Sequence, residues 1–219
     1  MWALAEKHGV SLPYDSVEAI KAAYQFDNLQ SFLDLYYQGA DVLRDEEDFY
    51  LLMRSYLRHC HDDNIVHTEI MFDPQTHTER GIGFDVFMPG FQRAIDEAKA
   101  QWGISVFLIM SFLRHLCEAS AIETLNHARD YYPVIKAVGL DSSEQGNPPE
   151  KFVKVFTAAR ALGFKCVAHA GEGWTVCVSS KRALDRRNDG IMLRQVDRIR
   201  NPRSTLTVPE RSFHAEPLN

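Results

Sequence analysis

Four short apolar segments, rich in β-branched and aromatic residues, alternate along the chain with longer segments of helical periodicity. The apolar segments span residues 65–72, 104–112, 134–140 and 164–168, and they recur about every 30 residues, the length of a βα unit. Strands that alternate with helices predict a parallel α/β sheet. Such a sheet is either an open, doubly wound sheet or a (β/α)8 barrel.

Helical spacing of apolar residues predicts the elements before and between these strands. The predicted helices span residues 15–26, 28–43, 45–61, 84–102, 118–131 and 148–162. Local signals support several of their ends. The helix at 45–61 begins with four acidic residues, which favour the helix dipole, and Gly103 follows the helix at 84–102.

Polar side chains follow each predicted strand, which is where active sites of parallel sheets lie. They are Asp73, Arg114, His115, Asp141, Ser142, Ser143, Glu144, His169 and Glu172. No glycine-rich phosphate loop follows any strand, which weakens the case for a nucleotide-binding, doubly wound sheet. Simpler interpretations stay open. Residues 141–144 also suit a turn before the helix at Pro148, Arg114 and His115 suit a helix cap, and Tyr36 and Tyr37 suit packing.

The composition excludes several classes of protein. Of the 219 residues 45% are hydrophobic and the formal net charge is −6, values typical of one globular core. No apolar run of about 18 residues predicts a membrane span, and no signal-peptide core is found near Met1. The acidic total argues against nucleic acid or an anionic membrane as partner. The four cysteines are widely spaced, which predicts reduced thiols and a cytoplasmic protein.

The charge changes sign along the chain. Residues 1–172 carry 15 Lys and Arg against 25 Asp and Glu, a net charge of −10, whereas residues 173–219 carry 9 against 5, a net charge of +4. Eight of the nine basic residues in the second part are arginine. A break in composition therefore falls directly after Glu172, and we expect the arginine-rich residues 173–219 to pack poorly against the body.

The last predicted strand ends in the sequence Val167-Ala168-His169-Ala170-Gly171-Glu172. A histidine at the carboxyl tip of a barrel strand is well placed to bind a metal ion. A glutamate just beyond it, on the turn, can reach the same cavity and transfer a proton. Taken singly, His169 also suits a hydrogen-bonded structural histidine and Glu172 a solvated loop acid.

The segment His169-Ala170-Gly171-Glu172 resembles the His-Ala-Gly-Glu motif of the adenosine and adenine deaminase family, zinc hydrolases with a (β/α)8 barrel. Residues 28–33, 48–50, 69–75 and 112–116 are also similar to segments of that family. Residues 138–144, followed by Pro148-Pro149-Glu150-Lys151-Phe152, resemble the adenine deaminase branch in particular. Together the similar segments cover about residues 1–172. The resemblance therefore implies a partial (β/α)8 barrel domain with about four βα units over residues 1–172, followed by a divergent tail, out of frame or disordered, over residues 173–219.

The resemblance implies one zinc ion, held by two histidines on the first strand, the histidine of this motif and a later aspartate. His169 would be the third histidine ligand and Glu172 the proton donor. Asp141, Ser143 and Glu144 would contact a purine substrate. Hydroxide formed at the zinc ion would attack C6 of adenine while Glu172 protonates N1, and ammonia and hypoxanthine would form.

The chain departs from the family at both ends. The first-strand His-x-His pair is absent, and after Glu172 the family's His-Asp-His-Gly and Ser-x-Asp-Asp-Pro segments do not appear. We therefore expect an incomplete, inactive copy of an adenine deaminase whose binding of Zn2+ is weak. Two alternatives stay open: an adenosine deaminase, or an inactive half-barrel that acts only as a binding protein. Uncovered sheet edges would favour self-association.

Overall fold

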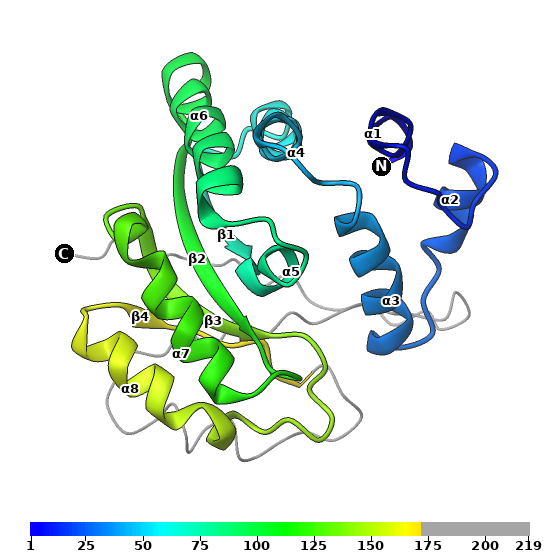
Figure 1. The fold of residues 1–219 in the computed structure, drawn as a ribbon. Helices are drawn as coiled ribbons and strands as arrows, with labels where there is room; N and C mark the ends of the chain where they lie inside the picture. Colours follow the sequence, from blue (N-terminus) through cyan, green and yellow to red (C-terminus); the bar gives the residue numbers. More distant parts are fainter. Residues whose placement is uncertain (172–219) are drawn as a thin grey trace, which may run out of the picture.

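A computed structural model describes residues 1–171, and its centre is a parallel sheet of four strands (Figure 1). The strands are β1 (His67–Phe72), β2 (Ser105–Leu113), β3 (Ile135–Asp141) and β4 (Lys165–Cys166), in the spatial order β1-β2-β3-β4. All three strand pairs are parallel, as the sequence predicts. The order runs in one direction, without the reversal of a doubly wound sheet, and therefore matches a segment of a (β/α)8 barrel.

Helices precede and connect these strands. They are α1 (Trp2–His8), α2 (Val17–Ala23), α3 (Leu29–Ala40), α4 (Glu46–Asp62), α5 (Pro74–Thr78), α6 (Phe84–Trp102), α7 (Glu118–His127) with the 3-10 turn η1 (Ala128–Tyr131), and η2 (Pro149–Phe152) with α8 (Val153–Ala161). The short α5 is absent from the sequence prediction, because Asp73-Pro74 suggests only the end of a strand. Instead Pro74 occupies the first turn of this helix, where a missing N–H costs nothing. Among the described helices, none combines the length and the apolar character needed to cross a bilayer.

The ends of the helices follow local sequence signals. The Asp45 carboxylate accepts a hydrogen bond from the amide of Asp48 at the start of α4. Asn28 accepts the corresponding bond from Ser31 at the start of α3, so both helices begin with reciprocal caps. Helix α6 ends at Gly103, whose φ of 69° lies in the left-handed region that glycine adopts without strain.

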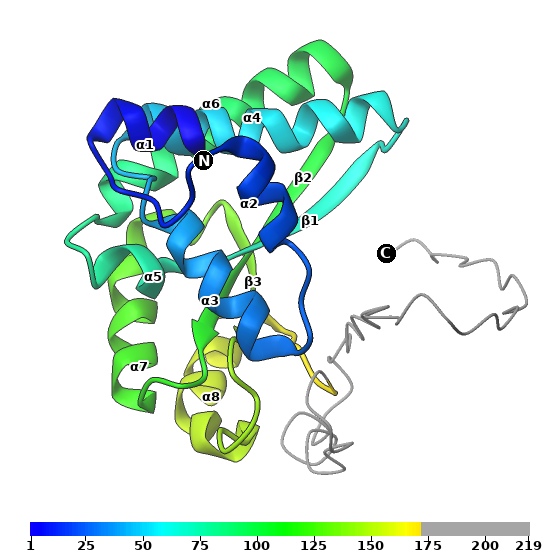
Figure 2. The same cartoon turned by 90° about the vertical axis from the view of Figure 1, so that its right-hand side faces the viewer.

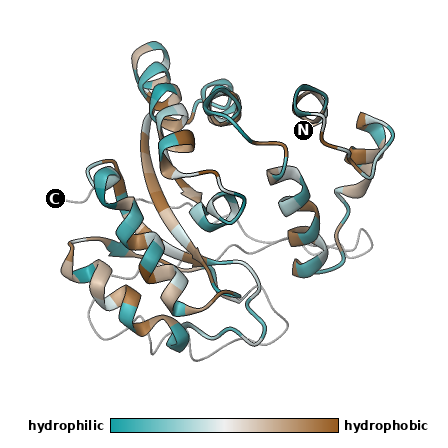
Figure 3. Cartoon of the chain, viewed as in Figure 1, coloured by the Kyte–Doolittle hydropathy of each residue, from teal (hydrophilic) through white to brown (hydrophobic). Residues whose placement is uncertain are grey.

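The main core lies between the sheet and the helices α4, α6, α7 and α8. Phe49, Leu57, Phe87, Met110 and Phe112 are among its fully buried side chains. Each such side chain contributes about 1.5–3 kcal/mol to the stability of the fold. In Figure 3 the ribbon of β2 is largely hydrophobic, whereas the helices alternate between hydrophilic and hydrophobic residues. This is the expected pattern for a buried strand that amphipathic helices cover.

Helix α3 lies on the opposite side of the sheet from α7 and α8 (Figures 1 and 2). Helix α3 borders the carboxyl ends of the strands, to which its side chains are hydrogen-bonded. The predicted domain boundary after residue 172 and the predicted behaviour of residues 173–219 lie outside the described residues. Both remain predictions.

Candidate active site at the carboxyl ends of the strands

A small apolar cluster, separate from the main core, marks the inner face of the sheet, which is turned away from α7 and α8. Each strand, or its continuation, contributes one residue to it: Met71, Ile109, Ala137 and Val167. Successive side chains of a strand point to opposite faces, so residues at even spacing from these four share their face. Asp73, Asp141 and His169 are such residues. The inner face therefore ends in polar side chains at the carboxyl ends of the strands.

His169 lies at the carboxyl end of β4, where the sequence predicts it. The amide of Val167 donates a hydrogen bond to the carbonyl of Val138 at 3.0 Å. The amide of His169 donates to the carbonyl of Leu140 at 2.9 Å, so the alignment of the strands continues three residues beyond β4. The carbonyl of His169 accepts a hydrogen bond from the Arg114 guanidinium at 3.0 Å. The backbone at this half-buried histidine is therefore held on both sides.

Glu172, the predicted proton donor, lies outside the described residues, so its role remains a prediction. The last described residue, Gly171, has φ 82°. That conformation is strained for residues with a side chain, and glycine adopts it freely.

The end of β3 carries two of the residues predicted to contact substrate, Asp141 and Ser143. Asp141 lies on the inner face and is 7% exposed. Ser142 has φ 72°, an uncommon value for a residue with a side chain, and turns the chain out of the strand. The hydroxyl of Ser143 donates a hydrogen bond to the side-chain oxygen of Gln30 in α3 at 3.0 Å. This segment is thus both the turn that ends β3 and a contact surface for α3.

Glu144, the third residue predicted to contact substrate, points into the loop after β4. It is 9% exposed, and both of its carboxylate oxygens lie 3.1 Å from the amide nitrogen of Gly171, which donates to them. One of these oxygens lies 3.9 Å from the guanidinium of Arg114. The side chain is therefore directed at protein groups, and these contacts give it a structural task whether or not it also meets a substrate.

Two tyrosines of α3 reach the strand ends through hydrogen bonds. The Tyr36 hydroxyl donates to the carboxylate of Asp73 at 3.0 Å. The hydroxyls of Tyr37 and Ser142 lie 2.8 Å apart, and Nδ1 of His115 lies 2.9 Å from the same Ser142 oxygen. Burial raises the pKa of Tyr37 to about 12 and lowers the pKa of His115. These groups therefore favour their uncharged forms near neutral pH, and they link α3 to β2 and β3.

A family model described as adenosine deaminase matches residues 1–187 of the chain. The chain belongs to the adenosine deaminase family. Within this family it is 56% identical over 172 residues to the adenine deaminase of Pseudomonas putida (strain W619) and 55% identical over 172 residues to that of Vibrio parahaemolyticus. Each match covers 78% of this chain, but 55% and 51% of the respective relative. The chain therefore spans about half the length of the curated relatives it matches.

Two solved structures share the fold. The adenine deaminase of Arthrobacter aurescens matches with a TM-score of 0.75 and 42% identity, over 78% of this chain and 53% of that chain. An amidohydrolase of Burkholderia ambifaria, solved with bound Zn, matches with a TM-score of 0.69 and 24% identity, over 78% of this chain and 47% of that chain. The four βα units are accordingly part of a (β/α)8 barrel, which confirms the predicted fold class.

In this family member, the described residues offer the predicted zinc site one ligand, His169. A zinc ion in a protein requires three or four ligands in a roughly tetrahedral array. Within residues 1–171, the group of ligand atoms that meets the spacing for a metal ion is His8, Asp45 and Asp48, whose atoms lie within 4.8 Å of one another. That group belongs to α1 and the start of α4, not to the carboxyl ends of the strands. Within residues 1–171, the strand ends therefore do not form a complete zinc site.

The group at His8 is better explained as a network of ion pairs. The ammonium of Lys7 lies 2.8 Å from the carboxylate of Asp45 and 2.7 Å from that of Asp48. Nε2 of His8 lies 2.6 Å from the other oxygen of Asp48, which also accepts the amide of Arg44 at 2.8 Å. The carboxylates are thus compensated by the chain's own cation and amides. The network fastens α1 to the first turn of α4.

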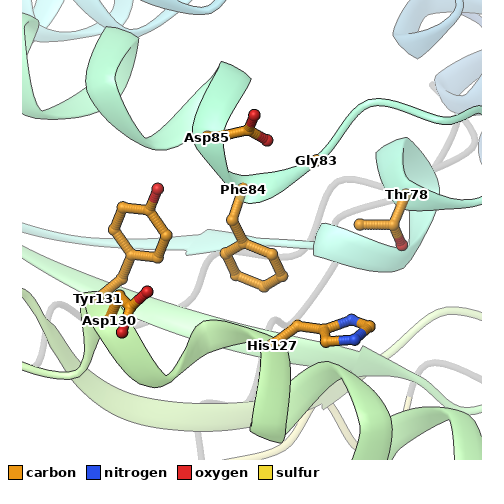
Figure 4. A pocket seen from close by; sticks show the side chains of 7 residues that line it. All are labelled: Thr78, Gly83, Phe84, Asp85, His127, Asp130 and Tyr131. Carbon is orange, nitrogen blue, oxygen red and sulfur yellow. The ribbon is translucent and has the colours of Figure 1, made fainter.

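A separate, shallow pocket of about 310 Å³ opens between the start of α6 and the end of α7 (Figure 4). Thr78, Gly83, Phe84, Asp85, His127, Asp130 and Tyr131 line it. The rings of Phe84 and Tyr131 stack at a centroid distance of 5.8 Å. None of the residues at the carboxyl ends of the strands lines this pocket. The candidate active site therefore remains the group at the carboxyl ends of the strands.

Several of these contacts are missed by the sequence patterns. Tyr36 and Tyr37 suggest packing, yet they bind Asp73 and Ser142, which follow strands far away in the sequence. Arg114 suggests a helix cap, yet its guanidinium reaches the loop after β4. The one sequence signal for this contact is the position of Arg114 directly after a predicted strand. The carboxyl ends of parallel strands meet at one edge, so a side chain there can reach the loop after another strand.

Proposed function

We propose that the chain carries part of the active site of an adenine deaminase, which hydrolyses adenine to hypoxanthine and ammonia in purine salvage. The observation that carries the proposal is the position of His169, at the carboxyl end of β4 and on the same face as Asp141. Family membership and 56% identity to an adenine deaminase over 172 residues support it. Active sites of (β/α)8 barrels are built at this end of the strands.

Each residue of the motif has a role in this proposal. His169 would present its imidazole to a zinc ion, and Glu172 would deliver a proton to the purine ring at N1. Asp141, Ser143 and Glu144 would border the purine. Zinc, when bound, supplies a Lewis acid and lowers the pKa of water to about 7. The remaining ligands would have to come from outside residues 1–171.

Two alternatives concern the same fold. One is a deaminase that acts on adenosine, which belongs to the same family. The other is a protein without turnover that uses the half-barrel to bind a purine or to associate with itself through the edges of the sheet. In either case we propose residues 1–172 as the barrel unit and residues 173–219 as a separate tail, in a cytoplasmic protein that binds neither nucleic acid nor membranes.

A chimera tests the proposal directly. Residues 1–172 of this chain replace the matching 172 residues of the Pseudomonas putida adenine deaminase, which supplies the remainder of the barrel. We expect the chimera to bind about one zinc ion and to convert adenine with a much higher kcat/KM than adenosine. The matched controls are His169→Ala, which should lose zinc, and Glu172→Gln, which should keep zinc and lose turnover.

The outcome separates the three functions. Comparable kcat/KM values for adenine and adenosine would contradict the adenine assignment and favour the adenosine alternative. A folded chimera that binds zinc but converts neither purine, although the parent enzyme is active, would favour a binding role.

A further inference from the structure

Arg114 spans the ends of three consecutive strands from a fully buried position. It follows β2, its side chain is 2% exposed, and its amide donates to the carbonyl of Asp141 at the end of β3. Its Nε donates to the carbonyl of Asn147 at 2.9 Å, in the loop after β3. Its Nη1 donates to the carbonyl of His169 at 3.0 Å, after β4. A buried guanidinium is costly without acceptors, so these bonds define where the two loops lie.

Glu144 contacts both the guanidinium of Arg114 and the loop after β4. Its carboxylate lies 3.9 Å from the guanidinium of Arg114 and accepts the amide of Gly171 with both oxygens. Charge-assisted hydrogen bonds of this type are stronger than neutral ones. The backbone of residues 169–171 is therefore held by a cation at its first carbonyl and by an anion at its last amide. Gly171 directly precedes Glu172 in the sequence.

We propose that Arg114 and Glu144 are positioning residues that hold the backbone of residues 169–171 and thereby set the direction of the His169 imidazole. Their link to catalysis rests on the proposed function, because it assumes that His169 and Glu172 act on a purine. That the two residues hold the backbone of residues 169–171 does not depend on the proposed function. Neither residue is a ligand or a proton donor in this proposal; both act through the backbone between the two groups of the motif.

The geometry explains why a charged pair is suited to this position. The guanidinium presents donors in a fixed plane, so one side chain can bind carbonyls of two different loops while facing a carboxylate. A displacement of about 1 Å in a reacting group can lower a rate roughly a hundredfold. A loop that carries both a ligand and a proton donor therefore gains from being fixed by side chains of the neighbouring strands.

Amide hydrogen exchange in the full 219-residue chain tests the proposal, with nuclear magnetic resonance as the readout. In Glu144→Ala the Gly171 amide should exchange at least about tenfold faster, because its acceptor is lost. Glu144→Gln keeps the shape and one acceptor oxygen, so it should give an intermediate rate. The amides of Met110 and Val138 in the sheet should not change, and neither should Gly171 in the exposed control Glu150→Gln.

A second readout follows the imidazole itself. The carbon–proton signal of the His169 ring should be single in the unaltered chain and should broaden or split in Glu144→Gln and Arg114→Lys. The proposal that Glu144 holds residues 169–171 would be overturned if the exchange rate of the Gly171 amide were unchanged in Glu144→Ala. It would also be overturned if the amides of Met110 and Gly171 were accelerated equally. Neither measurement requires zinc or turnover, so an inactive chimera would refute the proposed function and leave this inference to be decided separately.

Discussion

The ammonium of Lys7 lies 2.7 Å from the carboxylate of Asp48, which fastens the first helix to the N-terminal turn of α4. Asp48 is fully buried. Burial alone would raise the pKa of its carboxyl group, but hydrogen bonds from Lys7 and from the amides of Arg44 and Asp45 lower that pKa to about 2. The ionised carboxylate is therefore part of the folded structure.

This relationship predicts a dependence of stability on pH. Because the pKa of Asp48 falls from 3.8 to about 2 on folding, ionised Asp48 stabilises the fold above about pH 3.8. The stabilisation is lost as the pH falls from there toward 2. Asp48→Asn should lower the free energy of unfolding at pH 7 by about 1–3 kcal/mol and by less at pH 3, as measured in urea. The exposed Glu47→Gln serves as control, and equal losses at both pH values would contradict the prediction.

His77 gives a second prediction, in a higher pH range. Burial, with a smaller effect of the Arg80 guanidinium, lowers the pKa of His77 from 6.5 to about 4. The folded state therefore holds a neutral imidazole that the unfolded chain protonates more readily, so stability is complete above pH 6.5 and is lost as the pH falls toward 4. Between pH 7 and pH 5 the unaltered chain should lose about 2 kcal/mol more than His77→Gln. The exposed His59→Gln should behave like the unaltered chain in the same urea titrations.

Elements with a local cause are predictable from the sequence. Helix α6 is found at the predicted residues because apolar periodicity and Gly103 define it, and His169 is found at the predicted strand end. The contacts that assemble the site are different in kind. Tyr37 and Ser142 are 105 residues apart, and only the order of the strands brings them together. No local pattern encodes that order, so the hydrogen bonds of Tyr37 and the two loops that Arg114 joins become visible only in the structure.

Gly90 yields a third prediction, at the contact between α4 and α6. A methyl group on Gly90 would lie 2.5 Å from the carbonyl oxygen of Glu46 and 2.9 Å from the amide nitrogen of Tyr50. Both are backbone atoms of α4, so the helices would have to separate. Gly90→Ala should lower the free energy of unfolding by about 1–3 kcal/mol, despite the better helix propensity of alanine.

Gly39→Ala is the matched control for that experiment, since its nearest neighbour is the flexible end of the Met1 side chain. It should cost little or should stabilise α3 slightly. Thermal unfolding of both variants measures the difference, and equal midpoints would show that the two helices are not in close contact at Gly90.

The last prediction concerns the 219-residue chain by itself. We expect it to bind far less than one zinc ion per chain and to consume no adenine beyond the rate of its His169→Ala variant. The reason is the ligand set. Stable zinc sites use three or four protein ligands, and the described strand ends offer His169 as one. The carboxylates near His8 are compensated by Lys7, so they do not substitute for the missing ligands.

Elemental analysis of the purified chain, together with a spectrophotometric assay of adenine, checks this expectation, and the Pseudomonas putida adenine deaminase is the positive control. Without a bound metal ion, water keeps the high pKa that it has in bulk solution, so a carboxylic acid at residue 172 would have no strong nucleophile to assist. About one zinc ion per chain with turnover that His169→Ala abolishes would refute the prediction. In that case the remaining ligands must come from residues 172–219 or from a second copy of the chain, and measuring zinc binding against protein concentration would distinguish these two sources.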